Sequence, residues 1–367
     1  MKLGIDISRA FVKEKTGTEE YSYQLIRHIR SMDLNDHQIF LYVRNGSSAN
    51  FDLPQNFFIK EIGHNKLWTQ IGLSQEMKKN PVDVFFTPSH SIPFTHPKNS
   101  VVTIHGLEFK YCPECYSPKD RLLLELNISA SVKWASKIIA PSENTKKDLM
   151  KFYKVNPEKI KVVYHGIVIG NWKLVNWEIK NKSKKSQCFN ILFVGRIEKR
   201  KNLVNLIKAF EIFKNNPQLQ ITNYKLLLAG KEGYGFEEIK KAVFESPNKN
   251  DIILKGYVSE KEKEKLYKNA DVFVMPSLYE GFGLPILEAM SYSVPVICSD
   301  NSSLPEIAGG AGLLVDPNNI QEIAEAMNKV LNNADFREEM IKRGFENVKK
   351  FSWEKCARET MDVLLNC

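Results

Sequence analysis

The sequence predicts an α/β protein made of two doubly wound domains, each with an open, mostly parallel sheet. Short apolar runs alternate with helical patterns along the whole chain, and a polar segment without strong periodicity separates two sets of such runs. With 367 residues, 43% of them apolar, the chain is long enough to bury two full cores. Ligands of open α/β sheets bind beside the carboxyl ends of the strands, so the candidate site residues are expected there.

The first half contains six strand-like runs, with helical patterns between several of them, notably at residues 21–30 and 120–134. The predicted strands are residues 3–7, 39–43, 83–88, 101–105, 137–141 and 161–166.

The second half repeats the scheme and ends in three helical stretches at residues 320–331, 334–350 and 352–365. Its predicted strands are residues 189–195, 224–230, 251–256, 271–276, 295–299 and 312–316. The two domains are therefore placed at residues 1–168 and 187–350, joined by a Lys/Asn/Ser-rich linker at residues 169–186.

The charge distribution is uneven. Residues 151–200 hold 12 Lys and Arg against 3 Asp and Glu, which accounts for the whole net charge of +9. This stretch lacks the aromatic interleaving and the motifs of a nucleic-acid module, so we expect no nucleic-acid partner. The first residues lack a signal-peptide pattern and no apolar run reaches membrane-span length, which favours a cytoplasmic protein.

The six cysteines do not indicate a disulfide framework in a chain of this size. Cys112 and Cys115 have the spacing of metal ligands, but no second pair or histidine cluster follows them. We therefore expect no metal site.

A glycine-rich turn follows the predicted strand at residues 271–276 and precedes a helix. Gly281 and Gly283 let the backbone approach a ligand, and the free N–H groups of the helix start attract an anion. Glu280 and Glu288 flank the turn, where they would repel a phosphate but could each accept two hydrogen bonds from a vicinal diol of a sugar or ribose. The alternative is that acidic residues merely favour a helix N-terminus through its dipole.

Three further stretches lie at strand ends. Gly195 permits a tight turn before Arg196 and Lys201, two cations that could neutralise a diphosphate or form a solvated helix start. His105 ends a buried strand, where it could bind a substrate hydroxyl or serve as a structural histidine. Gly17 allows close approach at a helix N-terminus but lacks the spacing of a dinucleotide fingerprint.

Taken together, the motifs resemble those of the retaining glycosyltransferases of family 4, which have the GT-B fold. The most specific element is EGFGLPILE at residues 280–288, with seven residues between its glutamates. GRIEKRKNL, APSENTKKDL, SLPEIAGGAGLLVDP and the strand that ends in His105 follow the same family pattern, and the match covers nearly the whole chain.

The resemblance implies that the second domain binds a nucleoside diphosphate sugar, GDP-mannose or a UDP-hexose, and that the first domain binds a glycan or lipid-linked saccharide acceptor. The reaction would transfer a hexose, mannose or glucose, with retention and without a required cofactor or metal. The final segment, residues 351–367, would form a helix that packs back toward the first domain.

Residue roles are carried over by position. Glu280, His105, Arg196 and Lys201 would be catalytic: Glu280 and His105 at the donor sugar, and Arg196 and Lys201 at the diphosphate. The binding residues would be Glu288 at the ribose, Gly195 and Gly17 near the diphosphate, Gly256, Tyr257 and Val258 at the base, and Gly281, Phe282, Gly283 and Leu284 near the sugar and phosphate. Two departures stand out: Gly106 follows His105 where many relatives have Asp, and the first loop reads TGTEEY without a double glycine or Arg.

Other readings remain open at this point. A GT-B protein that binds a nucleotide sugar without transferring it, an epimerase or a phosphorylase would share the fold, although no cofactor lysine of a phosphorylase is recognisable. A dehydrogenase would require G-x-G-x-x-G after the first strand, which is missing. Lys146, Lys147, Lys151 and Lys154, at helical spacing, would suit peripheral contact with an anionic membrane at the inner face of the cell membrane, or simply a solvated helix face.

Overall fold

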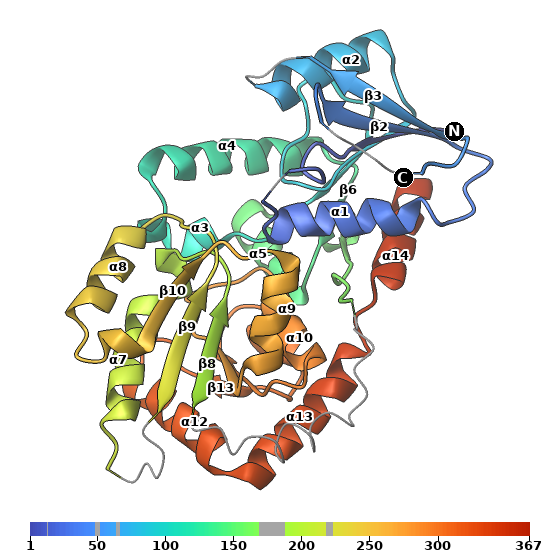
Figure 1. Ribbon diagram of the computed structural model, residues 1–367. Coiled ribbons are helices and arrows are strands. Elements are labelled where there is room, and N and C mark those ends of the chain that lie inside the picture. Colours follow the sequence, from blue (N-terminus) through green and yellow to red (C-terminus); the bar gives the residue numbers. More distant parts are fainter. Residues whose placement is uncertain (13, 48–51, 64–66, 169–187, 218–222) are drawn as a thin grey trace. The chain divides into compact units, whose positions relative to one another are not determined.

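A computed structural model describes residues 1–12, 14–47, 52–63, 67–168, 188–217 and 223–367 (Figure 1). The chain divides into two compact units. The first contains Met1–Leu107, Pro118–Gly166 and Phe351–Cys367, and the second contains Glu108–Ser117 and Ile167–Lys350. The predicted linker, residues 169–186, lies outside the described residues.

The first unit is built on a seven-stranded parallel sheet with the order β3-β2-β1-β4-β5-β6-β7. Its strands are β1 Lys2–Asp6, β2 Gln38–Arg44, β3 Phe57–Ile62, β4 Val84–Thr87, β5 Asn99–Thr103, β6 Lys137–Ala140 and β7 Ile160–Val162. The central strands are almost completely buried, as expected when helices cover both faces of a parallel sheet. The strand order reverses between β1 and β4, which makes this the switch point where ligands of such sheets bind.

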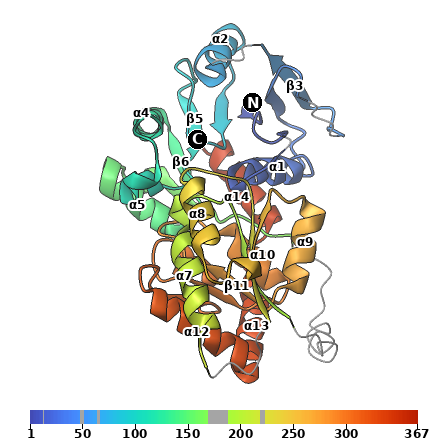
Figure 2. The same cartoon turned by 60° about the vertical axis from the view of Figure 1, so that its left-hand side comes forward.

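The helices of the first unit include the last helix of the chain. They are α1 Gly17–Ile29, η1 Trp68–Leu73, α2 Ser74–Lys79, α4 Pro118–Trp134, α5 Glu143–Tyr153, η3 Pro157–Lys159 and α14 Trp353–Leu365. Helix α14 packs against α1, and the two lie together in both views (Figure 2). A Cβ atom at Gly166 would lie 2.1 Å from the backbone nitrogen of Trp353, so this glycine permits the close approach of the chain where α14 begins. The last segment therefore returns to the first unit, as expected.

The second unit is built on a six-stranded parallel sheet with the order β10-β9-β8-β11-β12-β13. Its strands are β8 Phe189–Val194, β9 Tyr224–Ala229, β10 Ile252–Gly256, β11 Val272–Met275, β12 Val296–Ser299 and β13 Leu313–Val315. Its helices are α3 Glu108–Tyr111, η2 Pro113–Cys115, η4 Lys199–Lys201, α7 Leu203–Lys214, α8 Phe236–Glu245, η5 Lys249–Asp251, α9 Glu260–Asn269, α10 Leu284–Ser291, α11 Leu304–Ala308, α12 Ile320–Asn332 and α13 Ala334–Val348.

Local sequence explains where the helices of the second unit begin. Ser259 caps α9 and forms a capping box with Glu262. Asn319 and Asn333 accept the first free N–H groups of α12 and α13 through their side chains. Pro285 occupies the first turn of α10, where its missing N–H leaves no helical hydrogen bond unmade.

The structure differs from the predicted elements in one missed strand and at several strand ends, such as that of β7, which ends at Val162 rather than at residue 166. Strand β3 was missed because it is an edge strand with the sequence FFIKEI, whose four central residues are exposed, so it shows no continuous apolar run. Strand β5 ends at Thr103, so His105 lies two residues beyond the strand rather than at its last position.

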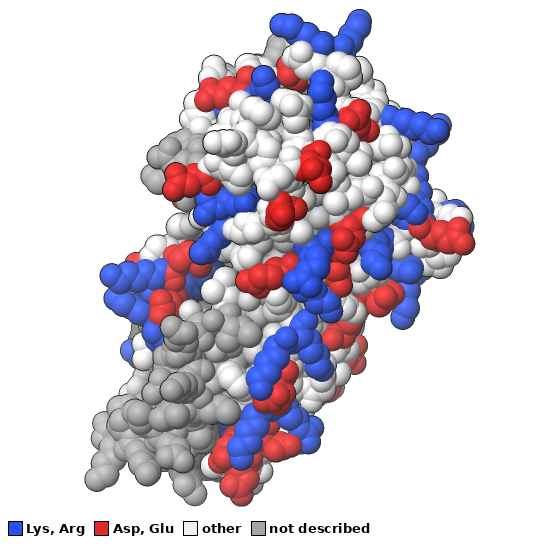
Figure 3. Space-filling model, turned by 90° about the vertical axis from the view of Figure 1, so that its right-hand side faces the viewer, with Lys and Arg blue, Asp and Glu red and all other residues white. Residues whose placement is uncertain are grey.

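The described surface carries interspersed charges. Much of the predicted basic stretch, residues 169–187, lies outside the described residues. On the face shown in Figure 3, basic and acidic side chains alternate over the described part of the chain. Some of the exposed charges are paired four residues apart on α13, such as Glu338 with Lys342 and Glu339 with Arg343. No helix among the described residues is long and apolar enough to span a bilayer.

Candidate active site

The loop after β8 begins with a close approach of two strand ends. Gly195 and Gly230 directly follow β8 and β9 and have φ values of +153° and +149°. A Cβ atom at Gly230 would lie 1.7 Å from the carbonyl oxygen of Gly195, so a side chain at residue 230 would displace the turn. The glycines thus fix where the loop that carries Arg196 leaves the sheet.

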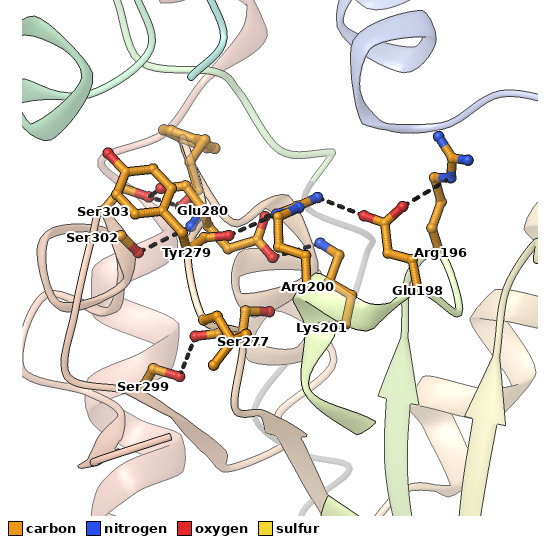
Figure 4. A network of polar contacts seen from close by, with 12 residues as sticks. Arg196, Glu198, Arg200, Lys201, Ser277, Tyr279, Glu280, Ser299, Ser302 and Ser303 are labelled. Carbon is orange, nitrogen blue, oxygen red and sulfur yellow. Dashed lines mark hydrogen bonds and ion pairs between the residues drawn. The ribbon is translucent and has the colours of Figure 1, made fainter. Parts of the chain in front are cut away.

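Five charged side chains of the second unit form a continuous chain of alternating sign (Figure 4). Glu198 contacts Arg196 at 3.4 Å (Oε2 to Nε) and Arg200 at 2.8 Å (Oε1 to Nη2). Glu280 contacts Arg200 at 2.9 Å (Oε2 to Nη1) and Lys201 at 2.5 Å (Oε1 to Nζ). The order is therefore cation, anion, cation, anion, cation, with Arg196 and Lys201 at the two ends.

The chain is buried at one end and open at the other. The side chains of Lys201 and Glu280 are 9% and 8% exposed, whereas that of Arg196 is 48% exposed. Burial alone would raise the pKa of Glu280, but Arg200 and Lys201 together lower it to about 2. Burial and the neighbouring Arg200 guanidinium lower the pKa of Lys201. The Glu280 carboxylate is thus ionised. An additional anion near Lys201 would offset the cost of burying the Lys201 ammonium.

The backbone on either side of Glu280 is fixed by the segment that precedes α11. Ser303 Oγ donates to the carbonyl oxygens of Glu280 (2.9 Å) and Phe282 (2.7 Å), and the backbone N–H of Glu280 donates to Ser302 Oγ at 3.1 Å. Gly283 then caps α10 with φ +110°, a conformation that favours glycine. The predicted strand, glycine turn and helix are confirmed, and Phe282 is buried while Leu284 starts the helix.

Glu288 lies one helical turn after Leu284 on α10, and its carboxylate has different partners from that of Glu280. Its Oε1 accepts from Lys263 Nζ and its Oε2 accepts from Tyr267 Oη, both at 2.8 Å. Burial raises the pKa of Tyr267. Burial alone would lower the pKa of Lys263, but the Glu288 carboxylate raises it, so both side chains are protonated and donate to Glu288. Lys263 and Tyr267 belong to α9, which follows directly after Gly256, Tyr257 and Val258.

The loop at residues 256–258 is open to solvent. Gly256 has φ +66° and a Cβ atom there would have no neighbour within 4 Å, while Tyr257 is 43% exposed and Val258 is partly buried. The structure therefore links the predicted base-contacting loop, through one short helix, to the predicted ribose-binding carboxylate.

His105 belongs to the first unit, next to other rings. Its Nε2 lies 2.7 Å from the carbonyl oxygen of Pro88. Because a carbonyl can only accept, Nε2 carries the proton. Burial and the neighbouring His90 lower the pKa of His105 to about 3, so the ring is neutral and Nδ1 is a hydrogen-bond acceptor. Tyr21 packs edge-on against the ring at 4.9 Å between centroids.

Gly17 begins α1 in the first unit. The backbone N–H of Thr16 donates to the Glu19 carboxylate at 3.1 Å, which closes the start of the helix. A Cβ atom at Gly17 would meet nothing within 4 Å. The space above this helix start is open, as a ligand-facing glycine requires.

The sequence did not predict four side chains that contact the predicted site residues. Arg200 and Glu198 lie between Arg196 and Lys201 in the same loop, and their charges looked like an ordinary solvated helix start. Lys263 and Tyr267 lie on a highly charged helix, and nothing in the sequence pairs them with Glu288. Side chains of this kind are identified only by the contacts that the fold creates.

Cys112 and Cys115 pack as apolar side chains. Both are buried with Tyr279, and burial raises their thiol pKa values to about 12 and about 11, so both stay protonated. With Glu114 they place three ligand-type atoms within 4.8 Å of one another. Tyr111, from the same segment, stacks on Tyr279 at 4.5 Å. The segment Glu108–Ser117 thereby packs beside Glu280 in the second unit.

Comparison with known proteins identifies the family of the chain. Residues 15–170 match the model of Glycosyltransferase Family 4, and residues 175–347 match that of Glycosyl transferases group 1. O-antigen chain mannosyltransferase B of Escherichia coli is 32% identical over 270 residues, which cover 72% of this chain and 70% of that protein. O-antigen chain mannosyltransferase RfbU of Salmonella typhimurium is 27% identical, with 72% and 70% covered.

Solved structures share the architecture. Sucrose-phosphate synthase from Thermosynechococcus elongatus superposes with a TM-score of 0.77 at 18% identity, over 100% of this chain and 98% of that chain. The Anabaena protein HepE, solved in complex with UDP-glucose, gives 0.74 at 17% identity over the whole of both chains. The chain belongs to glycosyltransferase family 4. It is a glycosyltransferase with the GT-B fold, as the sequence motifs indicated.

Proposed function

We propose that this protein transfers a mannosyl residue, with retention, from a nucleoside diphosphate sugar to a glycan or lipid-linked saccharide. The identity to two O-antigen chain mannosyltransferases supports mannose and a polysaccharide acceptor. The likeness to a fold solved with UDP-glucose supports a nucleotide sugar as donor. Glucose remains the alternative sugar, and GDP-mannose and a UDP-hexose are the two donors to compare.

The observation that carries this proposal is the contrast between the two glutamates around the glycine turn. Glu280 is tied to cations on both oxygens, whereas Glu288 is held by one ammonium and one hydroxyl. The successive parts of a nucleotide sugar match these groups of residues. Its base would lie at residues 256–258, its ribose at Glu288, and its diphosphate at Arg196 and Lys201, which leaves the sugar for Glu280.

In this arrangement the protein itself supplies the electrostatic part of the reaction. Arg196 and Lys201 would stabilise the negative charge that develops on the leaving nucleoside diphosphate, so a divalent metal would not be required. The neutral His105 would accept a hydrogen bond from a sugar hydroxyl through Nδ1. Attack would occur from the face of the leaving group, with a diphosphate oxygen taking the proton of the acceptor hydroxyl.

Nucleotide binding gives the first test. Thermal unfolding with GDP, UDP, ADP and NAD, each with EDTA and with Mg²⁺, reports the pocket because a ligand of the folded state raises the unfolding temperature. We expect a metal-independent shift with GDP or UDP that Glu288→Ala abolishes. Glu264→Ala is the matched control, because Glu264 lies on α9 but pairs with the half-buried Lys268 rather than with Lys263 or Tyr267. A shift with NAD alone would contradict the proposal.

Product analysis gives the second test. The enzyme is incubated with GDP-mannose or UDP-glucose and with methyl α-mannoside as a probe acceptor, and the product is analysed by NMR. We expect an α-linked mannosyl product. A β-linked product would contradict retention, and release of an epimerised nucleotide sugar would favour the epimerase alternative.

A further inference from the structure

Arg200 is the central member of the chain of alternating charges, and it contacts both carboxylates. Its Nη2 lies 2.8 Å from Glu198 and its Nη1 lies 2.9 Å from Glu280. Nη1 also donates to the carbonyl oxygen of Tyr279 at 2.7 Å. Its side chain is 13% exposed, so both terminal nitrogens are engaged inside the protein and Arg200 is poorly placed to bind a ligand itself.

The two cations expected to bind the diphosphate are not available as they stand. Arg196 is paired with Glu198, and Lys201 is paired with Glu280. To bind a diphosphate, each cation must give up part of its interaction with a carboxylate. A carboxylate left without a cation in a buried setting is costly, because its charge is then neither hydrated nor compensated.

Arg200 removes this cost because it is the second partner of each carboxylate. If Arg196 turns to the diphosphate, Glu198 keeps Arg200, and if Lys201 turns, Glu280 keeps Arg200. The five groups together carry one net positive charge, so the site is electropositive even with both carboxylates ionised. Contact with both carboxylates at once depends on the fork geometry of a guanidinium, which a lysine cannot reproduce.

We propose that Arg200 is a positioning residue that holds Glu198 and Glu280 in place while Arg196 and Lys201 exchange these carboxylates for the diphosphate of the donor. The role rests on the proposed function, because it requires a diphosphate ligand. It adds a residue that acts without touching the substrate and a reason for the alternating order of charges.

The groups around Glu280 predict how the removal of Arg200 would change its pKa. Arg200 and Lys201 face the carboxylate from the loop after β8, with Glu198 beyond them, and Tyr116 and Glu108 approach Arg200 from the segment Glu108–Ser117. Burial acts to raise the pKa of Glu280, and Arg200 is the strongest group opposing it. Removing Arg200 leaves Lys201 as the remaining cation on Glu280, so the pKa of Glu280 rises and Lys201 is held more firmly.

The test is calorimetric titration of the full chain with GDP and UDP between pH 5 and pH 8. The variants are Arg200→Met, Arg200→Lys and the control Lys214→Met. Lys214 is also 13% exposed and paired with Asp251 at 3.0 Å, but it lies outside this network. We expect Arg200→Met to weaken nucleotide binding by about tenfold or more at pH 8. The deficit should be smaller at pH 5, because protonation of Glu280 in this variant releases Lys201 for the diphosphate. Arg200→Lys should fall between, and Lys214→Met should bind like wild type.

Each outcome has a distinct meaning. Equal affinity of Arg200→Met and wild type at every pH would overturn the role of Arg200 and leave the proposed function standing. A deficit in Arg200→Met that is the same at all pH values, and is matched by Lys214→Met, would also overturn it, because general destabilisation would then explain the loss. If wild type binds neither nucleotide, the proposed function itself fails, and this role with it. Should Arg200→Met not fold, Arg200→Lys carries the same comparison.

Discussion

The two units have the same kind of parallel sheet but place opposite chemistry beyond their strand ends. The second unit gathers charges, with three cations and two carboxylates in one connected chain. The first unit gathers neutral rings: His105 lies 5.3 Å from His90 and 5.4 Å from His165, measured between ring centroids. Burial is the main cause that lowers the pKa of each of these three histidines.

We propose that this difference matches the two parts of the donor, its diphosphate and its sugar. A nucleoside diphosphate is strongly anionic and needs fixed positive charge, which must be kept paired while the site is empty. A saccharide has hydroxyl groups and no charge, so neutral hydrogen-bond acceptors suffice. Fold alone therefore does not determine the chemistry of a strand-end site; the side chains placed there do.

The largest expected effect is on turnover and concerns two cations of the second unit. Arg196→Ala should lower kcat about 100- to 1,000-fold, because a donor to developing charge is lost, while stability changes by less than about 0.5 kcal/mol since the side chain is half exposed. Lys201→Met should lower kcat similarly and also destabilise the protein by about 1.5 to 3 kcal/mol, because buried Glu280 loses one charge-assisted hydrogen bond but keeps Arg200. Steady-state kinetics and urea unfolding measure both. Normal turnover in a folded Arg196→Ala would remove Arg196 from this role.

A second prediction compares one glycine from each unit. Gly230→Ala should cost about 3 kcal/mol or more, because the new methyl group would collide with the Gly195 carbonyl at a φ of +149°. Gly17→Ala should leave stability unchanged or raise it by up to about 1 kcal/mol, because it adds a methyl group to open space at a helix start. If Gly17 faces the diphosphate, its alanine variant should nonetheless raise KM for the donor. Equal unfolding free energies for the two variants would refute the close approach at Gly230.

The pH dependence of stability should distinguish the units in two separate windows. The pKa values of His90 and His105 are lowered from 6.5 to about 4 and about 3, so the unfolded chain takes up protons that the folded chain does not. Their contribution is therefore present above pH 6.5 and lost as the pH falls toward 4 and 3. The pKa of Glu280 is lowered from 4.5 to about 2, so its contribution is constant down to about pH 4.5 and lost below.

The corresponding measurement is urea unfolding at pH 7, 6 and 5. We expect stability to fall over this range, and His90→Gln with His105→Gln to flatten the slope. Glu280→Gln should lower the whole curve without changing its slope above pH 5. A slope unchanged by the histidine substitutions would mean that these rings titrate normally and the contrast between the units is wrong.

The sequence predicted the architecture well because buried parallel strands are short, apolar and regularly spaced by helices. The turns that hold Gly195, Glu280 and Gly283 were also predicted, since each lies between a predicted strand and a predicted helix. The edge strand β3 was missed because its exposed residues hide its pattern. Arg200 was missed for a different reason. Its role comes from touching Glu280, 80 residues away along the chain, and a cation between two other cations gives no such signal.

The smallest expected effect concerns the exposed lysines of the first unit. Helix α5 carries Lys146, Lys147 and Lys151, and Lys154 follows at its end; the last three are exposed. Each lysine near an anionic surface contributes about 1 kcal/mol at most, so we expect weak binding to vesicles containing phosphatidylserine and none at high salt. Replacing Lys147 and Lys151 with Gln should reduce co-sedimentation about tenfold or less, while Lys240→Gln and Lys241→Gln on α8 of the second unit serve as matched controls. Equal binding by both double variants would mean that α5 is an ordinary solvated helix, and the difference between the units would then be confined to their strand ends.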